Sequence, residues 1–246
     1  MQISRPPSPR PTAPQPRRAP PCPRGWILAV PAGLALNLAV SVIVLGQGTG
    51  ALVAGAVYLA AAGIVAVGMR RHYPHAVMGA CNTVTLMRVA LTAALIAPLM
   101  GDAPAGWLVA AVAAISLTLD GVDGYLARRA NLCSDFGARF DMEVDAALAL
   151  ILALHALAGS PVGAEVLVLG VMRYLFAGAG LIWPWIMAPL PVSYFRKGVC
   201  VLQLATLIAL QIPQMPPDTG IIQARIASVA LVWSFARDVL WLWRHR

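Results

Sequence analysis

Apolar residues form eight long runs along the chain, and short polar segments separate them. Most runs approach the roughly 20 residues that an α-helix needs to cross a bilayer, so each run is predicted to form a transmembrane helix. One run is short, and we expect its helix to begin earlier. The expected spans are 26–46, 51–69, 83–100, 106–127, 140–158, 164–183, 198–212 (the short one) and 221–243.

Composition supports a membrane protein. Hydrophobic residues make up 59 % of the 246 residues and charged residues only 11 %, whereas a soluble domain carries about a quarter charged residues. The net charge of +8 is therefore interpreted as membrane topology and not as nucleic-acid binding. Residues 1–24 are rich in proline and arginine and cannot bury a core, so a disordered tail is expected there.

Positive charges follow the positive-inside rule when the N-terminus is placed in the cytoplasm. The outer loops near 47–50, 101–105, 159–163 and 213–220 contain no Lys or Arg. This pattern predicts a multi-pass protein of a bacterial-type inner membrane, with both termini cytoplasmic. The expected inner segments hold Arg70, Arg71, Arg128, Arg129, Arg139, Arg196, Lys197, Arg244 and Arg246.

Acidic residues are concentrated at the cytoplasmic end of the fourth and fifth spans, where six of the ten lie between Asp120 and Asp145. Asp120 and Asp123 are three residues apart, and Asp141 and Asp145 are four apart, so each pair shares a helix face. Two such faces brought together would form a cage of carboxylates that needs cations to neutralise it. Carboxylate oxygens suit Mg²⁺ or Mn²⁺ rather than zinc. Two ions in one carboxylate site are a common device of phosphoryl chemistry.

The same stretch reads Asp-x2-Asp-Gly-x2-Ala-Arg-x8-Gly-x3-Asp-x3-Asp, which resembles the signature of the CDP-alcohol phosphatidyltransferases with every spacing kept. Solvated acids at two helix ends would explain neither the spacing nor the glycines. The matching residues are Asp120, Asp123, Gly124, Ala127, Arg128, Gly137, Asp141 and Asp145.

The resemblance implies an all-α integral membrane protein with a six-helix catalytic core, and also a homodimer. We therefore expect a basic cytoplasmic tail at 1–24, two additional transmembrane helices at 25–71 and the six-helix catalytic domain at 80–246. Anchoring or packing against the core is the favoured role of the additional pair.

Roles in the motif combine physical reasoning with the resemblance. Gly124 would let a nucleotide approach the helix backbone, and Arg128 would pair with a diphosphate. By resemblance Asp145 is the general base, and Ser134 lies where several members have a nucleotide-contacting hydroxyl, although an ordinary loop serine explains it as well. The predicted metal ligands are Asp120, Asp123, Asp141 and Asp145.

The start of the third span carries a second, shorter match. The family usually has Pro-Asn-x-Leu-Thr-x-x-Arg here, and Asn82, Thr85 and Arg88 match it. By resemblance they help hold the CDP moiety. Asn82 is equally well explained as a helix N-cap. Arg88 lies one turn deeper on an apolar helix, so its charge should find an anionic partner.

Two adjacent cations, Arg196 and Lys197, precede the seventh span. They are either topology markers or ligands of an acceptor phosphate. Phosphatidylglycerophosphate synthases tend to have Ser-x-x-Gly-Lys-x-Lys-Thr-x-x-Gln in this region. The chain matches this pattern only in part, so the pattern does not identify the acceptor. Ser193, Lys197 and Gln203 match, and Arg196, Val199 and Cys200 depart.

These features predict transfer of a phosphatidyl group from CDP-diacylglycerol to a polar hydroxyl acceptor, with release of CMP. Glycerol 3-phosphate is the favoured acceptor, and inositol phosphate, serine, choline and phosphatidylglycerol are alternatives. Two other classes use membrane acids. A Mg²⁺-dependent prenyltransferase would need two Asp-rich motifs on distant helices, and a cation transporter would place its acids near mid-bilayer.

Overall fold

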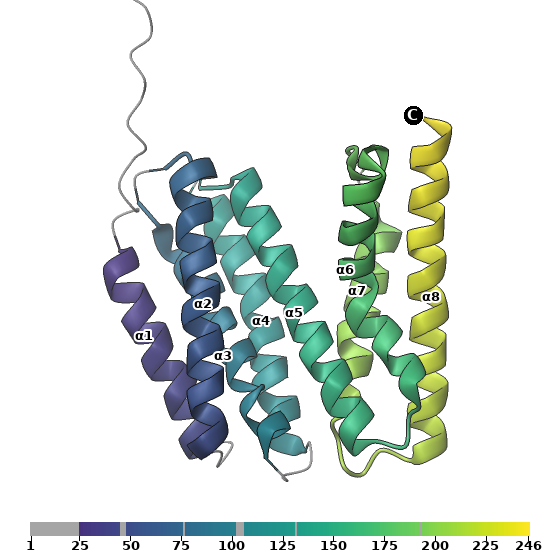
Figure 1. Ribbon diagram of the computed structural model, residues 1–246, viewed down its shortest axis with the longest axis horizontal. Helices are drawn as coiled ribbons and strands as arrows, with labels where there is room; N and C mark the ends of the chain where they lie inside the picture. Colours follow the sequence, from purple (N-terminus) through teal and green to yellow (C-terminus); the bar gives the residue numbers. More distant parts are fainter. Residues whose placement is uncertain (1–24, 45–47, 76, 102–105, 131, 192) are drawn as a thin grey trace, which may run out of the picture.

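The computed structural model describes residues 25–44, 48–75, 77–101, 106–130, 132–191 and 193–246. Eight α-helices run alternately up and down through a single bundle (Figure 1). They are α1 (Trp26–Ala39), α2 (Gly48–His72), α3 (Gly79–Ala94), α4 (Trp107–Arg129), α5 (Asp135–Gly159), α6 (Leu167–Ile182), α7 (Tyr194–Ala209) and α8 (Pro217–Arg244). Short helical turns accompany four of them: η1 (Val40–Val44), η2 (Ala97–Met100), η3 (Ala164–Val166) and η4 (Pro184–Met187).

All eight predicted spans coincide with an α-helix. Within the described residues, seven of these helices have the length and hydropathy to cross a membrane. The other is α7, which has only 16 residues and packs along α8. It begins earlier than its apolar run, as expected, because the Ser193 hydroxyl accepts a hydrogen bond from the Arg196 amide at 3.4 Å and caps it. The protein is an all-α integral membrane protein with two helices ahead of a six-helix core.

The connection between α4 and α5 corrects one expectation. The predicted spans 106–127 and 140–158 leave a long connection between them, but α4 continues to Arg129 and α5 already begins at Asp135. Ser134 caps α5 with its hydroxyl, and Asp135 adds a negative charge to the first turn, where the helix dipole favours it. These polar residues extend the helix beyond its apolar run, so the whole second half of the acidic motif is helical.

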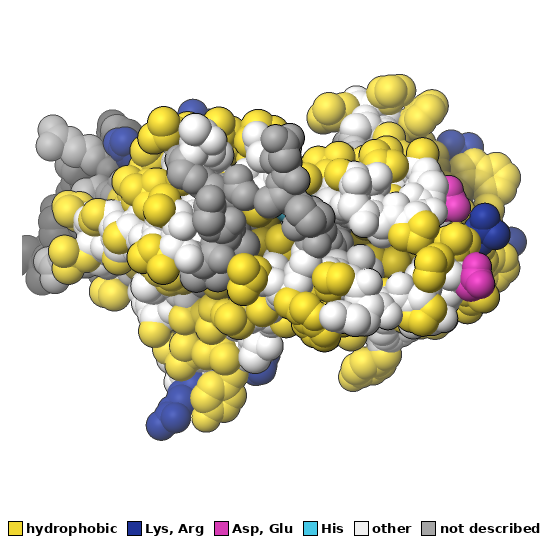
Figure 2. Space-filling view, turned by 90° about the horizontal axis from the view of Figure 1, so that it is seen from below, with side chains coloured by type: hydrophobic (Ala, Val, Ile, Leu, Met, Phe, Trp, Pro, Cys, Tyr) yellow, Lys and Arg dark blue, Asp and Glu magenta, His cyan; other side chains and the backbone are white. Residues whose placement is uncertain are grey.

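One end of the bundle gathers the start of α1, the α2–α3 and α4–α5 connections, the α6–α7 connection and the end of α8 (Figure 1). The acidic motif and the described basic residues expected on the inner side lie at this end. From the opposite end the surface is mostly apolar and neutral, and its few charged side chains lie near the edges of the view (Figure 2). This asymmetry agrees with the charge pattern along the chain.

The first two helices share a core with the helices around the acidic motif. One cluster of buried apolar side chains joins Ala29 of α1 and Tyr58 of α2 to Leu86 of α3 and Val144 of α5. The buried Asn37 amide on α1 also donates a hydrogen bond to the Ala90 carbonyl of α3 at 2.9 Å. The α1–α2 pair therefore packs directly against the helices that carry the acidic motif and its neighbours.

Helix α3 starts at a glycine whose backbone no other residue adopts easily. Gly79 has φ +71°, in the left-handed region, and a Cβ atom there would collide with Leu132 from the α4–α5 connection. Gly79 thus sets both the start of α3 and its contact with the loop before α5.

Replacing Gly79 with alanine should lower the free energy of unfolding by at least about 1–2 kcal/mol, because the left-handed backbone penalises a side chain and Leu132 must move. Thermal unfolding in detergent measures the change. Gly63→Ala on α2 is the matched control, since its Cβ would meet nothing within 4 Å. A Gly79→Ala protein that unfolds at the wild-type temperature would contradict this account of the α3 start.

Candidate functional site

Four carboxylates from α4 and α5 converge on the Arg88 guanidinium of α3. Arg88 Nη1 lies 2.9 Å from Asp120 Oδ1 and 3.1 Å from Asp123 Oδ2. Arg88 Nη2 lies 2.5 Å from Asp145 Oδ1. Arg88 Nη1 also pairs with Asp141 Oδ1, and the arginine side chain is fully buried. The predicted cage of carboxylates is thereby confirmed, and so is the anionic partner expected for Arg88.

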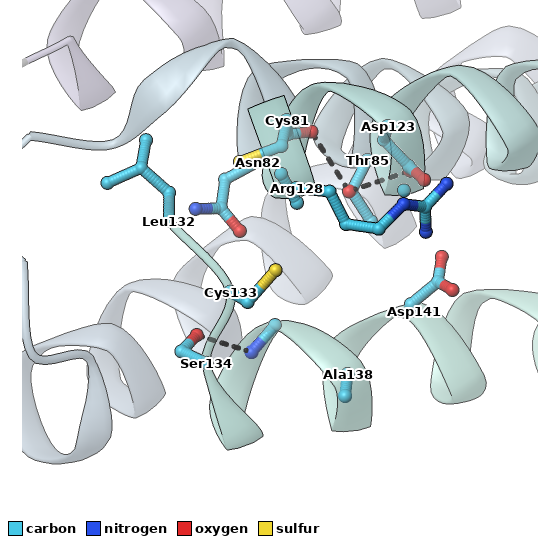
Figure 3. Close-up of a pocket in the computed structure, with 13 residues that line it drawn as sticks. Cys81, Asn82, Thr85, Asp123, Arg128, Leu132, Cys133, Ser134, Ala138 and Asp141 are labelled. Atoms are coloured by element: carbon cyan, nitrogen blue, oxygen red, sulfur yellow. Dashed lines mark hydrogen bonds between the residues drawn. The ribbon is translucent and has the colours of Figure 1, made fainter. Parts of the chain in front are cut away.

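Neighbouring polar groups hold this arrangement. Arg88 Nε donates to the Ser116 carbonyl at 3.1 Å, which orients the guanidinium along α4. Thr85 Oγ1, one turn before Arg88, lies 2.9 Å from Asp123 Oδ2 and 3.1 Å from the Cys81 carbonyl (Figure 3). Asp123 is therefore fixed from α3, as a buried carboxylate must be if it is to keep its charge.

Three of the carboxylates have the geometry of a divalent-cation site. Asp120, Asp141 and Asp145 each offer an oxygen, and these oxygens all lie within 4.8 Å of one another. Asp120 Oδ1 is buried and accepts no hydrogen bond from any described residue, although it lies close to Arg88. A set of three hard oxygen ligands this close together fits Mg²⁺ or Mn²⁺.

A cavity of about 230 Å³ opens beside the carboxylates, between α3, the end of α4 and the start of α5. Its two ends differ in charge (Figure 3). Asp123, Asp141 and Arg128 lie at one end, whereas Asn82 and Leu132 lie at the other. A ligand with a charged diphosphate and a neutral nucleoside would match this division.

Asn82 does not cap α3, which corrects that interpretation. The helix begins at Gly79, one turn earlier, and Asn82 lies inside the first turn and is 4 % exposed. Its amide nitrogen donates to the Met78 carbonyl at 2.7 Å and to the Tyr73 hydroxyl at 2.8 Å. The side chain nevertheless lines the cavity, at the end away from the carboxylates.

Three further predicted nucleotide residues, Ser134, Gly124 and Arg128, also line the cavity, whereas Arg88 does not. Ser134 accepts a hydrogen bond from the Gly137 amide at 3.0 Å and caps α5, so its hydroxyl has a structural role at the cavity wall. Gly124 lies beneath the Arg128 side chain, and a Cβ there would lie 3.4 Å from Arg128 Nη1. Arg128 is exposed and pairs with no carboxylate among the described residues, which leaves it available to an anionic ligand.

The predicted acceptor residues behave differently from one another. Arg196 Nη1 pairs with Asp238 Oδ2 of α8 at 3.0 Å, so its charge is largely neutralised within the protein. Lys197 is exposed, and its ammonium lies 5.9 Å from the centroid of the Tyr194 ring. The first turn of α7 lies at the same end of the bundle as the carboxylates (Figure 1), and α7 packs against both α4 and α5.

Two residues of the partial synthase pattern have structural partners. Ser193 accepts from the Arg237 guanidinium at 3.0 Å besides capping α7. The Gln203 amide donates to the Leu169 carbonyl of α6. Of the three matching residues, Lys197 alone has no such partner among the described parts of the chain.

Sequence reasoning missed two contacts of this end of the bundle. Asp238 pairs with Arg196, and an acid on an apolar helix was a signal for such a partner. Tyr73, whose hydroxyl accepts a hydrogen bond from the Asn82 amide, lies in the α2–α3 connection. No spacing rule could have linked it to the site, because its position depends on how the connection folds back onto α3.

The comparison with family models matches residues 78–238 to CDP-alcohol phosphatidyltransferase. No curated protein and no solved structure matches the chain significantly. The matched residues cover well over half of the chain and include the whole acidic motif, Arg88 and the cavity. The chain belongs to the CDP-alcohol phosphatidyltransferase family.

Proposed function

We propose that the protein transfers a phosphatidyl group from CDP-diacylglycerol to a polar hydroxyl acceptor and releases CMP. Family membership supports the class of reaction. The observation that carries the proposal is the cavity, which has carboxylates at one end and neutral polar groups at the other, beside the expected acyl-chain environment of the membrane. A cation transporter would need acids near mid-bilayer, whereas the acids of this motif lie at one end of the bundle.

The roles of the side chains follow from their positions. Asp145 lies in the carboxylate cluster and would take the proton as the acceptor hydroxyl oxygen attacks the β-phosphorus. The bond from that phosphorus to the oxygen of CMP breaks in the same displacement. Arg128 at the cavity wall would bind the diphosphate, and Gly124 leaves room for it near the α4 backbone.

Asp120, Asp123, Asp141 and Asp145 would hold the divalent cations, Mg²⁺ or Mn²⁺, and we propose two ions. When bound, such cations neutralise the diphosphate and stabilise negative charge on the leaving group. The predicted contacts of the CDP-lipid also include Arg88, Asn82, Thr85 and Ser134. Among them, Arg88 contacts the carboxylates in this structure.

The proposal includes the orientation and assembly expected from the sequence. The active site and both termini face the cytoplasm, because the described basic residues share one end of the bundle with the carboxylates. The six helices from residue 80 onward are the catalytic domain, the helices within 25–71 are an addition to it, and the protein is a homodimer by analogy with its family. The tail at 1–24 lies outside the described residues.

Release of CMP by the purified protein in detergent tests the function. The assay contains CDP-diacylglycerol, Mg²⁺ or Mn²⁺, and one acceptor at a time: glycerol 3-phosphate, inositol phosphate, inositol, serine, choline or phosphatidylglycerol. Release that depends on one acceptor would establish the reaction and identify the acceptor. Failure to bind CDP-diacylglycerol would overturn the proposal.

We further propose that the acceptor is anionic, as glycerol 3-phosphate is, because Lys197 is exposed at the same end of the bundle as the site, with no carboxylate partner among the described residues. Lys197→Ala should raise the acceptor KM by about 10-fold, the effect of losing one charge-assisted contact, and leave the KM for CDP-diacylglycerol nearly unchanged. Initial rates measured over both substrate concentrations separate the two constants.

Two variants control this prediction. Lys197→Arg keeps the charge and should keep most of the acceptor affinity. Arg129→Ala removes another exposed cation at the same end of the bundle, close to Tyr125, and should change neither KM. Equal increases in both KM values for Lys197→Ala would exclude the specific role of this lysine.

A further inference from the structure

Tyr73 connects the two N-terminal helices to the nucleotide end of the cavity. It follows α2 directly and precedes the residues matched to the family, which begin at 78. Its side chain is 5 % exposed. The hydroxyl lies 2.8 Å from Asn82 Nδ2, 3.1 Å from the Val77 carbonyl and 3.2 Å from the Met78 carbonyl.

This hydroxyl completes the hydrogen bonding of the Asn82 amide. The Asn82 nitrogen has two protons, and its two partners are the Met78 carbonyl and the Tyr73 oxygen. Tyr73 can accept from Asn82 and still donate its own proton to a carbonyl at the start of α3. With both amide protons used inside the protein, the Asn82 side chain can offer a ligand only its oxygen.

The Asn82 oxygen is turned across the cavity. A Cβ atom on Gly137, in the first turn of α5, would lie 3.8 Å from Asn82 Oδ1, and both residues line the cavity. The amide orientation therefore presents a hydrogen-bond acceptor at the end away from the carboxylates. Donors of a nucleoside, its hydroxyl or amino groups, complement such an acceptor.

Tyr73 is itself held firmly. Its ring packs edge-on against Phe136 of α5, with centroids 6.2 Å apart, and against His75 with centroids 5.2 Å apart. Burial raises the pKa of the Tyr73 hydroxyl above its ordinary value, so the group stays protonated near neutral pH. One side chain thus joins the end of α2, the start of α3 and the start of α5.

We propose that Tyr73 is a positioning residue that orients Asn82 to bind the nucleoside part of the CDP-lipid. The inference rests on the proposed function. It gives the additional N-terminal helices a role beyond anchoring, because the end of α2 places the hydroxyl. It also extends the nucleotide site to a residue outside the part of the chain that matches the family.

Binding of CMP and of inorganic pyrophosphate to the full-length protein, measured by calorimetry in detergent with Mn²⁺ present, tests the inference. Tyr73→Phe removes only the hydroxyl. It should raise the Kd for CMP by about 5–10-fold, the effect of one lost hydrogen bond, and leave the Kd for pyrophosphate unchanged, since pyrophosphate has no nucleoside.

Tyr58→Phe is the matched control. Tyr58 is also a buried tyrosine on α2, and its hydroxyl donates to the Val30 carbonyl of α1 at 3.0 Å, remote from the cavity. This variant should bind CMP like the wild type. In an Asn82→Ala background, Tyr73→Phe should weaken CMP binding by less than about 2-fold further, because the two residues act as a unit.

The outcomes separate this inference from the proposed function. Wild-type protein that binds no CMP would overturn the proposed function and this inference with it. CMP binding by wild type that is unchanged in Tyr73→Phe would overturn only the positioning role. Equal weakening of CMP and pyrophosphate in Tyr73→Phe would also overturn it, since a general structural defect would then explain the loss.

Discussion

Replacing Asp145 with asparagine should lower the rate of CMP release by at least about 100-fold, because a general base contributes roughly 10²–10⁴-fold to such a step. Asparagine has nearly the same shape but cannot accept the proton of the attacking hydroxyl. It also replaces one of the three carboxylates that can hold a cation with a neutral amide. The rate is measured with saturating CDP-diacylglycerol and the acceptor found active.

Binding of CDP-diacylglycerol by the same variant distinguishes catalysis from folding. Asp145→Asn should still bind the CDP-lipid within about 10-fold of wild type, since Asp145 does not line the nucleotide cavity and one ionic contact contributes about 1 kcal/mol. Asp135→Asn, an exposed acid at the start of the same helix, is the control and should keep full activity. Activity of Asp145→Asn within about 3-fold of wild type would exclude Asp145 as the base.

The carboxylate cluster could be predicted because two local rules act together. Helical spacing places Asp120 with Asp123 and Asp141 with Asp145 on common faces. A short connection then keeps the end of one helix beside the start of the next. The number of helices was likewise readable from hydropathy, since a backbone in lipid must satisfy its own hydrogen bonds. The length of the connection between α4 and α5 could not be predicted from hydropathy, because capping extended α5 beyond its apolar run.

For contacts between distant segments, the sequence predicted the type of partner but not which residues provide it. The position of Arg88 on an apolar helix predicted an anionic partner, but the packing of α3 against α4 and α5 decides that four carboxylates share it. The N-cap interpretation of Asn82 was wrong because the left-handed backbone of Gly79 starts α3 a turn earlier. A glycine three residues ahead was the local signal for that start.

Replacing Arg88 with methionine should lower the free energy of unfolding by about 3–5 kcal/mol in EDTA, the cost of removing one partner from a buried ionic cluster. Methionine keeps much of the volume, so the loss reflects charge more than packing. Four carboxylates would then lie together with no described cation among them. Chemical unfolding in detergent measures the difference.

A matched arginine provides the control. Arg173 of α6 pairs with Glu143 of α5 at 2.5 Å, but both side chains are partly exposed, at 33 % and 53 %. Exposed ion pairs contribute about 0–1 kcal/mol, so Arg173→Met should destabilise the protein far less than Arg88→Met. Equal losses would mean that the burial of Arg88 among the carboxylates does not determine its contribution.

Divalent cations should then rescue the Arg88→Met protein more than they stabilise the wild type. Without the guanidinium, the oxygens of Asp120, Asp141 and Asp145 repel one another and bind a cation more tightly. Saturation at about 100 times Kd would restore roughly 2.7 kcal/mol, measured as the change in unfolding free energy between EDTA and millimolar Mn²⁺. The variant should nevertheless remain impaired in catalysis, because Arg88 also orients Asp123 and Asp145 through direct hydrogen bonds. A Mn²⁺ effect equal in both proteins would show that the arginine and the cation do not neutralise the same carboxylates.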